Sequence, residues 1–425
     1  MSPETQPALA VIIFAATYAA IISERIHRTT AALAGAALLV LSGLLSQEEA
    51  FRAVDWNTIG LLLGMMTTVE IIKQTGIFEW LAIAAARLTR GNPALIMAAL
   101  AVITAVVSAF LDNVTTVLLI VPVTLSITRV LEVNPVPFLI SEIFASNIGG
   151  TATLIGDPPN IMIGGAIGFS FNDFIKFNTP AILIILPITV WLFHLVYHKD
   201  VKSKAPSRDR LQEFDPSDYL QDRTLLVRSS LILALMIGGF VLQRYLHLQA
   251  ATIALAGAIL LLLISRQPIG KVLREVEWPV ILFFAGLFIL VRGLEVYGVL
   301  RWIAKETLAV TGTNLFLTTM LTLWTSALLS SFIDNIPFVA TMIPLIKTLG
   351  TLSGMDVGPL WWALSLGACL GGNGTVIGAS ANVVVTGIAA KMGHPISFRR
   401  YLKVGYPVML VSILISTVYL WWRFF

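Results

Sequence analysis

Charged residues and cysteine are both scarce in this chain. Only 12% of its 425 residues are Asp, Glu, Lys or Arg, whereas 57% are hydrophobic. A soluble domain of this length carries about twice that share of charge, so the composition excludes an ordinary soluble protein. The single cysteine, Cys369, excludes an internal disulfide and a cysteine-based metal site.

Catalytic motifs are absent as well. The chain has no phosphate-binding loop, no ATPase motif and no Ser/His/Asp arrangement. His194 and His198 have the spacing of a metal-ligand pair, but their place at the end of an apolar segment favours an interfacial position. The basic residues behind the net charge of +4 lie in loops, where they set membrane orientation. We therefore expect no enzymatic activity, cofactor, metal ion or nucleic-acid partner.

What the chain does contain is a series of long apolar segments. The predicted membrane spans lie near residues 8–23, 29–46, 56–74, 138–165 and 177–197 of the first part, with a broken segment at 94–131. Each is long enough to cross a hydrocarbon core about 30 Å thick. Without period-2 alternation these segments favour helices over a β-barrel. The sequence thus predicts an all-α polytopic membrane protein surrounded by lipid.

One pattern of glycine and polar residues occurs twice, 222 residues apart. The repeated landmarks include Ala32–Ala36 with Ala254–Ala258, Asp112-Asn113 with Asp334-Asn335, and Gly149–Asn160 with Gly371–Asn382. No gap is needed between about residues 32 and 160, which chance agreement of apolar runs does not explain. We predict two related halves, residues 1–197 and 226–425, joined by a charged linker at 198–225.

The basic loops predict how these halves lie in the membrane. All of them fall on one side if 94–131 and its copy return to the side from which they enter. The charge rule allows either a re-entrant hairpin or two full spans there. With hairpins, each half crosses five times, so the fold is two inverted repeats of five transmembrane helices plus one re-entrant hairpin each. We expect both termini outside the cytoplasm, the linker inside it, and the protein in the inner or plasma membrane.

Interrupted apolar segments are typical of secondary transporters with inverted repeats. Four interruptions occur, at Asp112–Thr116, Gly149–Asn160, Asp334–Pro337 and Gly371–Asn382. Unwound backbone inside a membrane is tolerated where it lines a cavity or is buried in protein, and it exposes N–H and carbonyl groups to a solute. The pseudo-symmetry predicts that the four breaks meet near the midplane. The candidate substrate or ion ligands there are Asp112, Asn113, Thr115, Thr116, Asn147, Thr151, Thr153, Asp157, Asn160, Asp334, Asn335, Asn373, Thr375 and Asn382.

Carboxylates inside these segments have two interpretations. A buried carboxyl is costly in a membrane and is often a proton carrier, so Asp112 and Asp334 are candidates for coupling. Each could instead cap a half-helix, and both roles could hold together. Asp157, which precedes two prolines, is open between a coupling role and a capping turn. Glu142, one turn before Ser146 and Asn147, is open between a functional and a structural role.

These motifs resemble a known family. The segments Phe110–Thr116 and Asn147–Asn160 look like those of the ion transporter superfamily, and within it the chain resembles arsenite efflux permeases and the melanosomal P-protein group. The resemblance covers essentially the whole chain. More distant relatives are sodium/proton antiporters and sodium-coupled dicarboxylate or citrate carriers. The resemblance implies a scaffold domain and a moving transport domain.

The same resemblance suggests a substrate. Dicarboxylate carriers hold sodium with Ser-Asn-Thr motifs at the hairpin tips, whereas this chain has Asp112-Asn113 and Asp334-Asn335 there, and no Lys or Arg in the motifs. We therefore expect a proton-coupled antiporter that exports arsenite or antimonite, an uncharged trihydroxide suited to hydrogen bonding. A sodium/proton antiporter or an organic-anion carrier is the alternative. A cytosolic ATPase partner and a homodimer are compatible with the resemblance.

Overall fold

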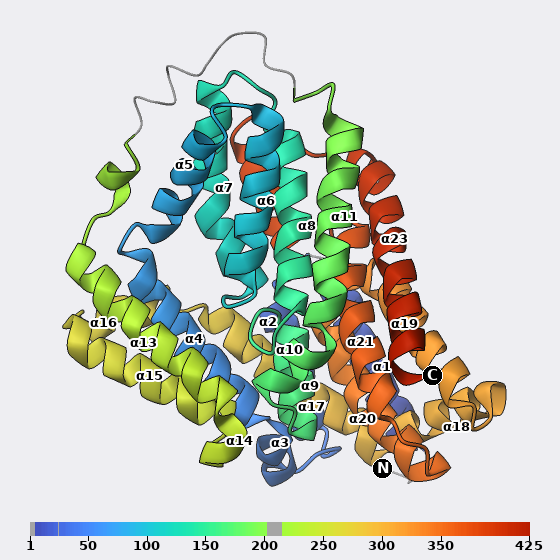
Figure 1. Ribbon diagram of the computed structural model, residues 1–425. Coiled ribbons are helices and arrows are strands. Elements are labelled where there is room, and N and C mark those ends of the chain that lie inside the picture. Colours follow the sequence, from blue (N-terminus) through green and yellow to red (C-terminus); the bar gives the residue numbers. More distant parts are fainter. Residues whose placement is uncertain (1–4, 24, 202–214) are drawn as a thin grey trace.

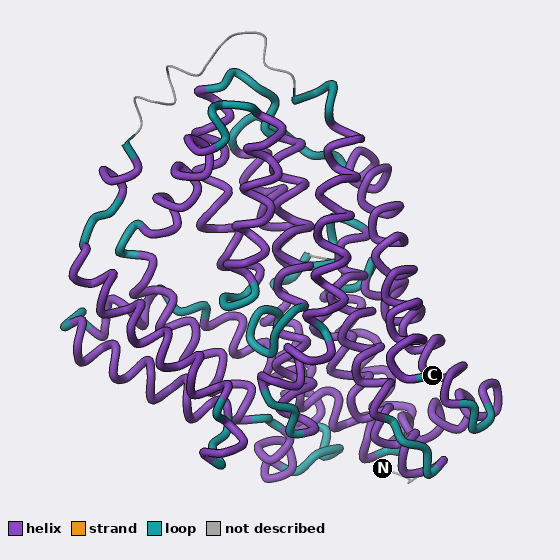
Figure 2. The backbone as a smooth tube through the Cα atoms, in the orientation of Figure 1, coloured by secondary structure: helices purple, strands orange, loops and turns teal. Residues whose placement is uncertain are grey.

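The computed structural model describes residues 5–23, 25–201 and 215–425. Within these ranges every regular element is a helix, and no strand occurs (Figure 2). The predicted all-α architecture is therefore confirmed for the described chain. Part of the predicted linker, 202–214, lies outside the described residues.

The helices of the first half follow one another with short connections. They are α1 Thr5–Ile22, α2 Arg28–Leu41, α3 Gln47–Ala53, α4 Trp56–Lys73, α5 Ile77–Leu88, α6 Pro93–Ser108, α7 Asn113–Val130, α8 Val136–Thr151, α9 Pro158–Ile167, α10 Phe171–Phe177 and α11 Thr179–Tyr197. After the linker come η1 Pro216–Tyr219, α13 Arg223–Val241, α14 Gln243–Leu246, α15 Ala250–Ser265, α16 Ile269–Glu275, α17 Trp278–Val296, α18 Val299–Thr311, α19 Leu315–Ser330, α20 Asn335–Ser353, α21 Gly358–Gly371, η2 Gly372–Gly374, α22 Ser380–Lys391 and α23 Phe398–Phe424.

The helix boundaries repeat with the sequence offset. α3 and α16, and likewise α6 and α19, begin and end at residues 222 apart. Local signals explain several of these boundaries. Ser46 and Glu49 form a capping box at the start of α3, and Asn92 caps α6 ahead of Pro93 at its first position. Asn314 likewise caps α19, whereas α16 begins after Pro268 without a side-chain cap. The boundaries therefore repeat even where the capping residue does not.

The two halves pack on each other reciprocally. Helix α4 packs against α15 of the second half, and α17 packs against α2 of the first. Glycine allows both close approaches: a Cβ on Gly64 would lie 2.6 Å from the Ala254 carbonyl carbon, and one on Gly286 would lie 2.9 Å from that of Ala32. These contacts join the halves into one body, so the sites described below draw on both.

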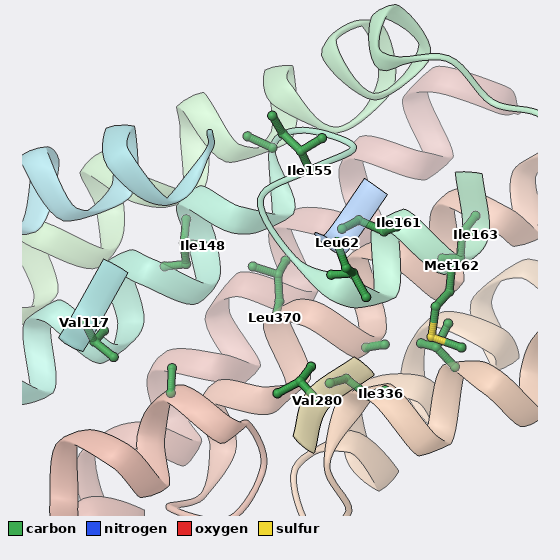
Figure 3. Close-up of a cluster of buried hydrophobic side chains, with 14 of the residues drawn as sticks. Leu62, Val117, Ile148, Ile155, Ile161, Met162, Ile163, Val280, Ile336 and Leu370 are labelled. Carbon is green, nitrogen blue, oxygen red and sulfur yellow. The ribbon is translucent and has the colours of Figure 1, made fainter. Parts of the chain in front are cut away.

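The breaks lie in the middle of the molecule. The α6–α7 hairpin turns there at residues 109–112, below its open end in the upper part of Figure 1. Around the breaks, buried apolar side chains from both halves form one cluster, which Figure 3 shows with Leu62, Val117, Ile148, Val280 and Ile336 among its members. The polar breaks are thus enclosed by a shared apolar core.

Seven of the described helices are long and apolar enough to cross a membrane, and an eighth span forms if α4 and α5, bent by 61°, count as one. α2, α6, α15 and α19 are apolar but shorter. By length and composition the chain is a multi-pass membrane protein. The inverted orientation, the five-plus-hairpin topology, the domain boundaries and the sidedness of the termini stay predictions.

Candidate functional site

Each hairpin tip places an aspartate at the start of its second helix. Asp112 is the N-cap of α7 and accepts hydrogen bonds from the Thr115 backbone N–H at 2.8 Å and its hydroxyl at 2.5 Å. Asp334 is the N-cap of α20 and accepts from the Ile336 N–H at 3.0 Å. The capping interpretation is therefore confirmed for both aspartates, and it leaves one oxygen of Asp334 for a partner elsewhere.

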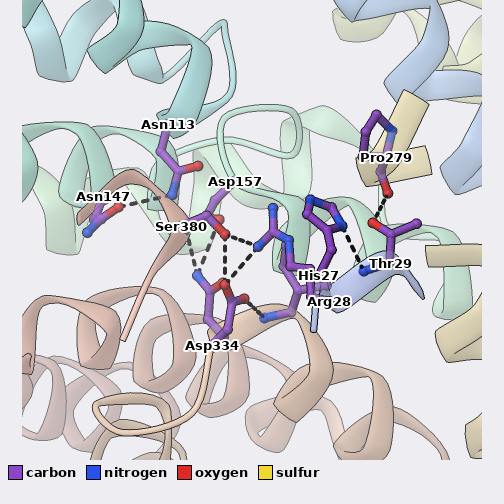
Figure 4. Close-up of polar contacts among 11 residues, drawn as sticks. His27, Arg28, Thr29, Asn113, Asn147, Asp157, Pro279, Asp334 and Ser380 are labelled. Atoms are coloured by element: carbon purple, nitrogen blue, oxygen red, sulfur yellow. Dashed lines mark hydrogen bonds and ion pairs between the residues drawn. The ribbon is translucent and has the colours of Figure 1, made fainter. Parts of the chain in front are cut away.

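The partners of this second Asp334 oxygen come from helices that are far away in the sequence. The Oδ2 of Asp334 accepts a hydrogen bond from Ser380 Oγ, at the start of α22, at 2.7 Å. It also forms an ion pair with Arg28, at the start of α2, at 3.2 Å. Arg28 donates to Ser380 as well, and its guanidinium lies over the Phe283 ring, 5.3 Å from the centroid. Figure 4 shows this triad of Arg28, Asp334 and Ser380 from three separate helices.

Asp157 does not cap α9, which corrects the capping-turn interpretation. It stands at the N-cap position, but its side chain makes no capping hydrogen bond. Its carboxylate instead faces Asn335 of the opposite tip, whose amide nitrogen lies 3.4 and 3.5 Å from the two oxygens. The two prolines after Asp157 explain part of this, because Pro at the first helical positions has no N–H for a cap to satisfy.

A chain of amides joins the two halves at the centre. Asn113 donates to the Asn147 oxygen at 3.0 Å. Asn147 in turn donates to the oxygens of Asn373 at 3.0 Å and Asn382 at 2.9 Å. All four side chains are buried, so each hydrogen bond satisfies groups that water does not reach. Asn382 uses its own amide to hold the broken segment of its half, through the carbonyls of Gly372 and Thr375.

Asn160 performs the equivalent task in the first half. Its amide donates to the carbonyls of Thr151 at 3.1 Å and Thr153 at 2.8 Å, and its oxygen accepts from Ser365 at 2.6 Å. The Thr153 and Thr375 hydroxyls donate to the carbonyls of Ala109 and Ser331 at the tips. Asn160, Thr153 and Thr375 therefore hold the breaks in shape rather than facing an open space.

A small cavity lies between the tips. It is lined by Arg28, Asp112, Asn113, Asp157, Glu277 and Asn335, with Leu62, Met66, Val114, Pro158, Val280, Ile336 and Ser380 completing its wall. About 20 Å³ is open to a water-sized sphere, which is room for one or two waters. We call it the tip cavity. Its wall carries three carboxylates and one arginine.

Two larger hollows lie near the tip cavity. The first vestibule, about 590 Å³, is lined by Ile26, His27, Phe332 and Asp334 and shares Arg28, Val114, Glu277 and Ser380 with the tip cavity. The second vestibule, about 580 Å³, is lined by Asp55, Met162, Arg292, Ala340 and Lys347 and shares no lining residue with it. Glu49 lies at the second vestibule, where a backbone and a hydroxyl hydrogen bond from Ser46 hold its pKa below the usual value. The tip cavity thus adjoins one vestibule in this conformation.

Some of the predicted ligands line the tip cavity or the adjoining vestibule, and the others do not. Asp112, Asn113, Asp157 and Asn335 line the tip cavity, and Asp334 lines the adjoining vestibule. The side chains of the other predicted residues do not line these spaces; they are Thr115, Thr116, Asn147, Thr151, Thr153, Asn160, Asn373, Thr375 and Asn382. Of these, the Thr116 hydroxyl and the Asn373 amide nitrogen are buried without a partner.

Sequence reasoning missed Arg28, Glu277 and Ser380. Arg28 was interpreted as a loop charge that sets orientation, but it pairs with Asp334 at the tip. The repeated motifs contain no Lys or Arg, as the sequence shows, but a basic side chain from outside them reaches the tip. A signal existed for Glu277, because an acidic residue followed by Trp recurs in the repeat as Asp55-Trp56 and Glu277-Trp278. Arg28 has Ala250 as its counterpart 222 residues later, so the repeat gave no hint of its role.

The fold and these buried polar breaks define a polytopic α-helical membrane transporter. The solved structure of the YdaH transporter from Alcanivorax borkumensis has a similar fold, with a TM-score of 0.57, 16% sequence identity, and 85% of this chain and 84% of that chain covered.

The chain belongs to the citrate transporter family, whose model matches residues 18–367. An uncharacterised transporter of Mycobacterium tuberculosis strain H37Rv is 44% identical over 423 residues, covering 98% of both chains. The human P protein is 35% identical over 503 aligned positions, covering 99% of this chain and 60% of the P protein. The predicted resemblance to the P-protein group is thereby confirmed.

Proposed function

We propose that this chain is a proton-coupled antiporter that exports arsenite or antimonite through the tip cavity. The observation that carries the proposal is the charge of the cavity wall, where Asp112, Asp157 and Glu277 face a single arginine. Like charges held together in a confined, partly dry space favour proton uptake. A neutral trihydroxide could then exchange with protons, since amide and carboxyl oxygens accept its hydrogen bonds.

Alternating access supplies the mechanism. The tip cavity adjoins the first vestibule and not the second, as expected of a carrier open to one side. Movement of the tips relative to α4 and α17 would close the first route and open the second. Arg28 would release Asp334 when a substrate or proton arrives, because the ion pair is only partly buried, with 28% and 16% of the two side chains exposed.

Arg28 also supports a second candidate, an organic-anion carrier. The family is described as citrate transporters, and a guanidinium at the cavity can bind a carboxylate through two parallel hydrogen bonds. The sequence-based argument against such a substrate depended on repulsion by the tip carboxylates and on the absence of Lys or Arg from the motifs. Arg28 weakens the second part of that argument, whereas the carboxylates of the wall still oppose an anion, so the two substrates need a direct test.

The test is uptake into everted membrane vesicles with an imposed inside-acid pH gradient, with arsenite and citrate measured in parallel. Accumulation of arsenite that a protonophore abolishes, and that the double variant Asp112→Asn/Asp334→Asn lacks, supports the first candidate. Because an anion that moves together with protons or sodium needs an inward gradient of that ion, citrate uptake is also measured with the pH gradient reversed and with an inward sodium gradient, and accumulation that Arg28→Gln abolishes supports the second. If neither substrate accumulates above the level of empty vesicles while folded protein is present, both candidate functions are excluded. The ATPase partner and the homodimer stay predictions that co-purification would test.

A further inference from the structure

Among the described residues, one further carboxyl group is as fully buried as that of Asp157, and it lies away from the tip cavity. Glu142, on α8, is 1% exposed. The Thr124 hydroxyl of α7 donates to its Oε1, whereas its Oε2 is buried and has no hydrogen-bond partner. Glu142 lines neither the tip cavity nor the two vestibules.

No charged side chain stands against it. Helices α6, α7, α11, α21 and α22 pack on α8, and Tyr401 of α23 stacks on its Phe144. Of the described groups on these elements, the titratable side chains turned inward are Tyr197, Cys369, Tyr401 and Tyr419. The basic side chains Arg129, His194, Lys391, Arg399, Arg400 and Lys403 are exposed, and Arg423 near the end of α23 is half-buried. Of the described residues, Thr124 is the one whose side chain forms a hydrogen bond with Glu142.

The second half shows that packing does not need a carboxyl here. The counterparts of Glu142 and Thr124, 222 residues later, are Leu364 and Ile346. Both are fully buried on the equivalent helices α21 and α20. An apolar pair therefore fills the same place in the same fold. The polar pair of the first half carries a cost that the fold does not require, which points to a function.

The surroundings of Glu142 determine whether its carboxyl group is protonated. An ionised carboxylate with one hydroxyl donor and no cation is prohibitively costly in a dry interior. Glu142 is therefore a neutral acid in this conformation, with the Oε2 proton free to be given to water. It lies five residues before Asn147, about 7.5 Å along the helix axis, so it moves with the helix that carries the central amides.

We propose that Glu142 is a proton-binding site of the transport cycle, separate from the tip cavity. It holds a proton in the conformation described here and gives it to water, as carboxylate and hydronium, when the alternate conformation hydrates α8. This deepens the proposed function and rests on its proton coupling. Of the two halves, the first carries this proton-binding group, and the second has the apolar residues Leu364 and Ile346 in the same place.

Infrared spectroscopy tests the protonation without any substrate. Purified wild-type protein in lipid at neutral pH should show the carbonyl stretch of a protonated carboxylic acid that is missing in Glu142→Gln. The exposed Glu306 on α18 is the matched control, and Glu306→Gln should leave that band unchanged. The double variant Glu142→Leu/Thr124→Ile, which copies the second half, provides a folded chain without the group. A difference spectrum with only carboxylate bands for Glu142 overturns the proposal.

Transport tests the carrier role. In proteoliposomes, with whichever of arsenite or citrate the vesicles accumulate, Glu142→Gln should lose at least tenfold of the accumulation driven by a pH gradient. It should keep substrate exchange in the absence of a gradient. Unchanged gradient-driven accumulation in Glu142→Gln overturns the carrier role even when the infrared band is present. Failure of both substrates in wild type counts against the proposed function, and the infrared result stands apart from it.

Discussion

The two hairpin tips have the same Asp-Asn sequence and different surroundings. Asp112 satisfies its carboxylate within its own first turn, through Thr115. Asp334 has Pro337 at the position equivalent to Thr115, and its second oxygen pairs with Arg28 and Ser380 of other helices. One tip is closed on itself and the other is tied to α2. The repeated sequence therefore supplies the shape of both tips, and unrepeated residues decide what each tip can release or bind.

The same division holds deeper in the core. The Ser108 and Ser330 hydroxyls each donate at 2.7 Å to a carbonyl of the neighbouring helix, at Ser146 and Ala368. These symmetric contacts hold the hairpins. By contrast, Asn147 is matched by Cys369 and Asp157 by Ala379. Structural contacts follow the duplication and buried amides come from both halves, whereas the fully buried carboxyl groups of the described chain, Glu142 and Asp157, lie in the first half.

The largest expected effect comes from the tips. Asn caps a helix as well as Asp does, so Asp112→Asn and Asp334→Asn both keep their helices. Asp334→Asn also loses a charge-assisted pair, worth about 1.5–3 kcal/mol, and should slow substrate exchange in proteoliposomes roughly 10- to 150-fold. Asp112→Asn should change exchange by less than about threefold but remove the response to a pH gradient.

Two results would contradict the expected difference between the two tips. Equal loss of exchange in both variants would mean that the tips act alike, despite their different partners. An Asp112→Asn variant that keeps wild-type exchange and wild-type pH response would leave Asp112 a helix cap only. The Arg28→Gln variant is the control, because it removes the same pair from the other side and should match Asp334→Asn in exchange rate.

The next effect concerns the central amides. Asn147→Ala leaves the Asn113 amide and the oxygens of Asn373 and Asn382 with one partner fewer. Each buried group left unpaired costs roughly 1–3 kcal/mol. Cys369→Ala removes the weak contacts of a thiol, among them one of 3.7 Å to Asn160 and one to Asp157, and should cost about 1 kcal/mol. Thermal unfolding of the two variants in detergent measures the difference, and equal loss would show that the amide chain does not stabilise the junction.

The sequence predicted the parts of this site that the duplication carries. Asp112 and Asp334, with the Asn that follows each, begin α7 and α20 as expected, since an Asp after a break is a strong helix-start signal. Periodic apolar segments and a constant offset likewise predicted the helices. These features depend on residues close together in the chain, and short-range chemistry fixes them.

The parts that could not be predicted depend on contacts between remote segments. Arg28 reaches Asp334 across 306 positions of sequence, and Asn335 reaches Asp157 across 178. Nothing in the local pattern around Arg28 distinguishes it from the other basic residues of its loop. Several predicted ligands, such as Asn160 and Asn382, hold broken backbone, because a break needs internal partners before it can offer any to a solute.

A smaller effect is expected where the breaks fold back on themselves. A Cβ on Gly150 would overlap the Gly156 carbonyl oxygen, whereas one on Gly372 would lie 3.0 Å from that of Gly378. Gly150→Ala should therefore destabilise the protein by about 1–3 kcal/mol, and Gly372→Ala by less. Unfolding monitored by intrinsic fluorescence gives the two values. A larger loss in Gly372→Ala would contradict the tighter packing of the first break.

The smallest expected effect distinguishes the connection between α4 and α5 from the one between α17 and α18. Gly76 and Gly298 have φ near +76° and +73° at the α4–α5 and α17–α18 bends, so alanine costs about 1 kcal/mol at either one. Only the first bend is covered: the Gln221 N–H donates to the Thr75 carbonyl at 3.0 Å, and a Cβ on Gly76 would overlap the Tyr219 carbonyl oxygen, whereas Gly298 has open space. Gly76→Ala should therefore also release η1 and speed proteolysis of the chain around Tyr219, and Gly298→Ala should not. Equal proteolysis in the two variants would mean that η1 is not held by this bend.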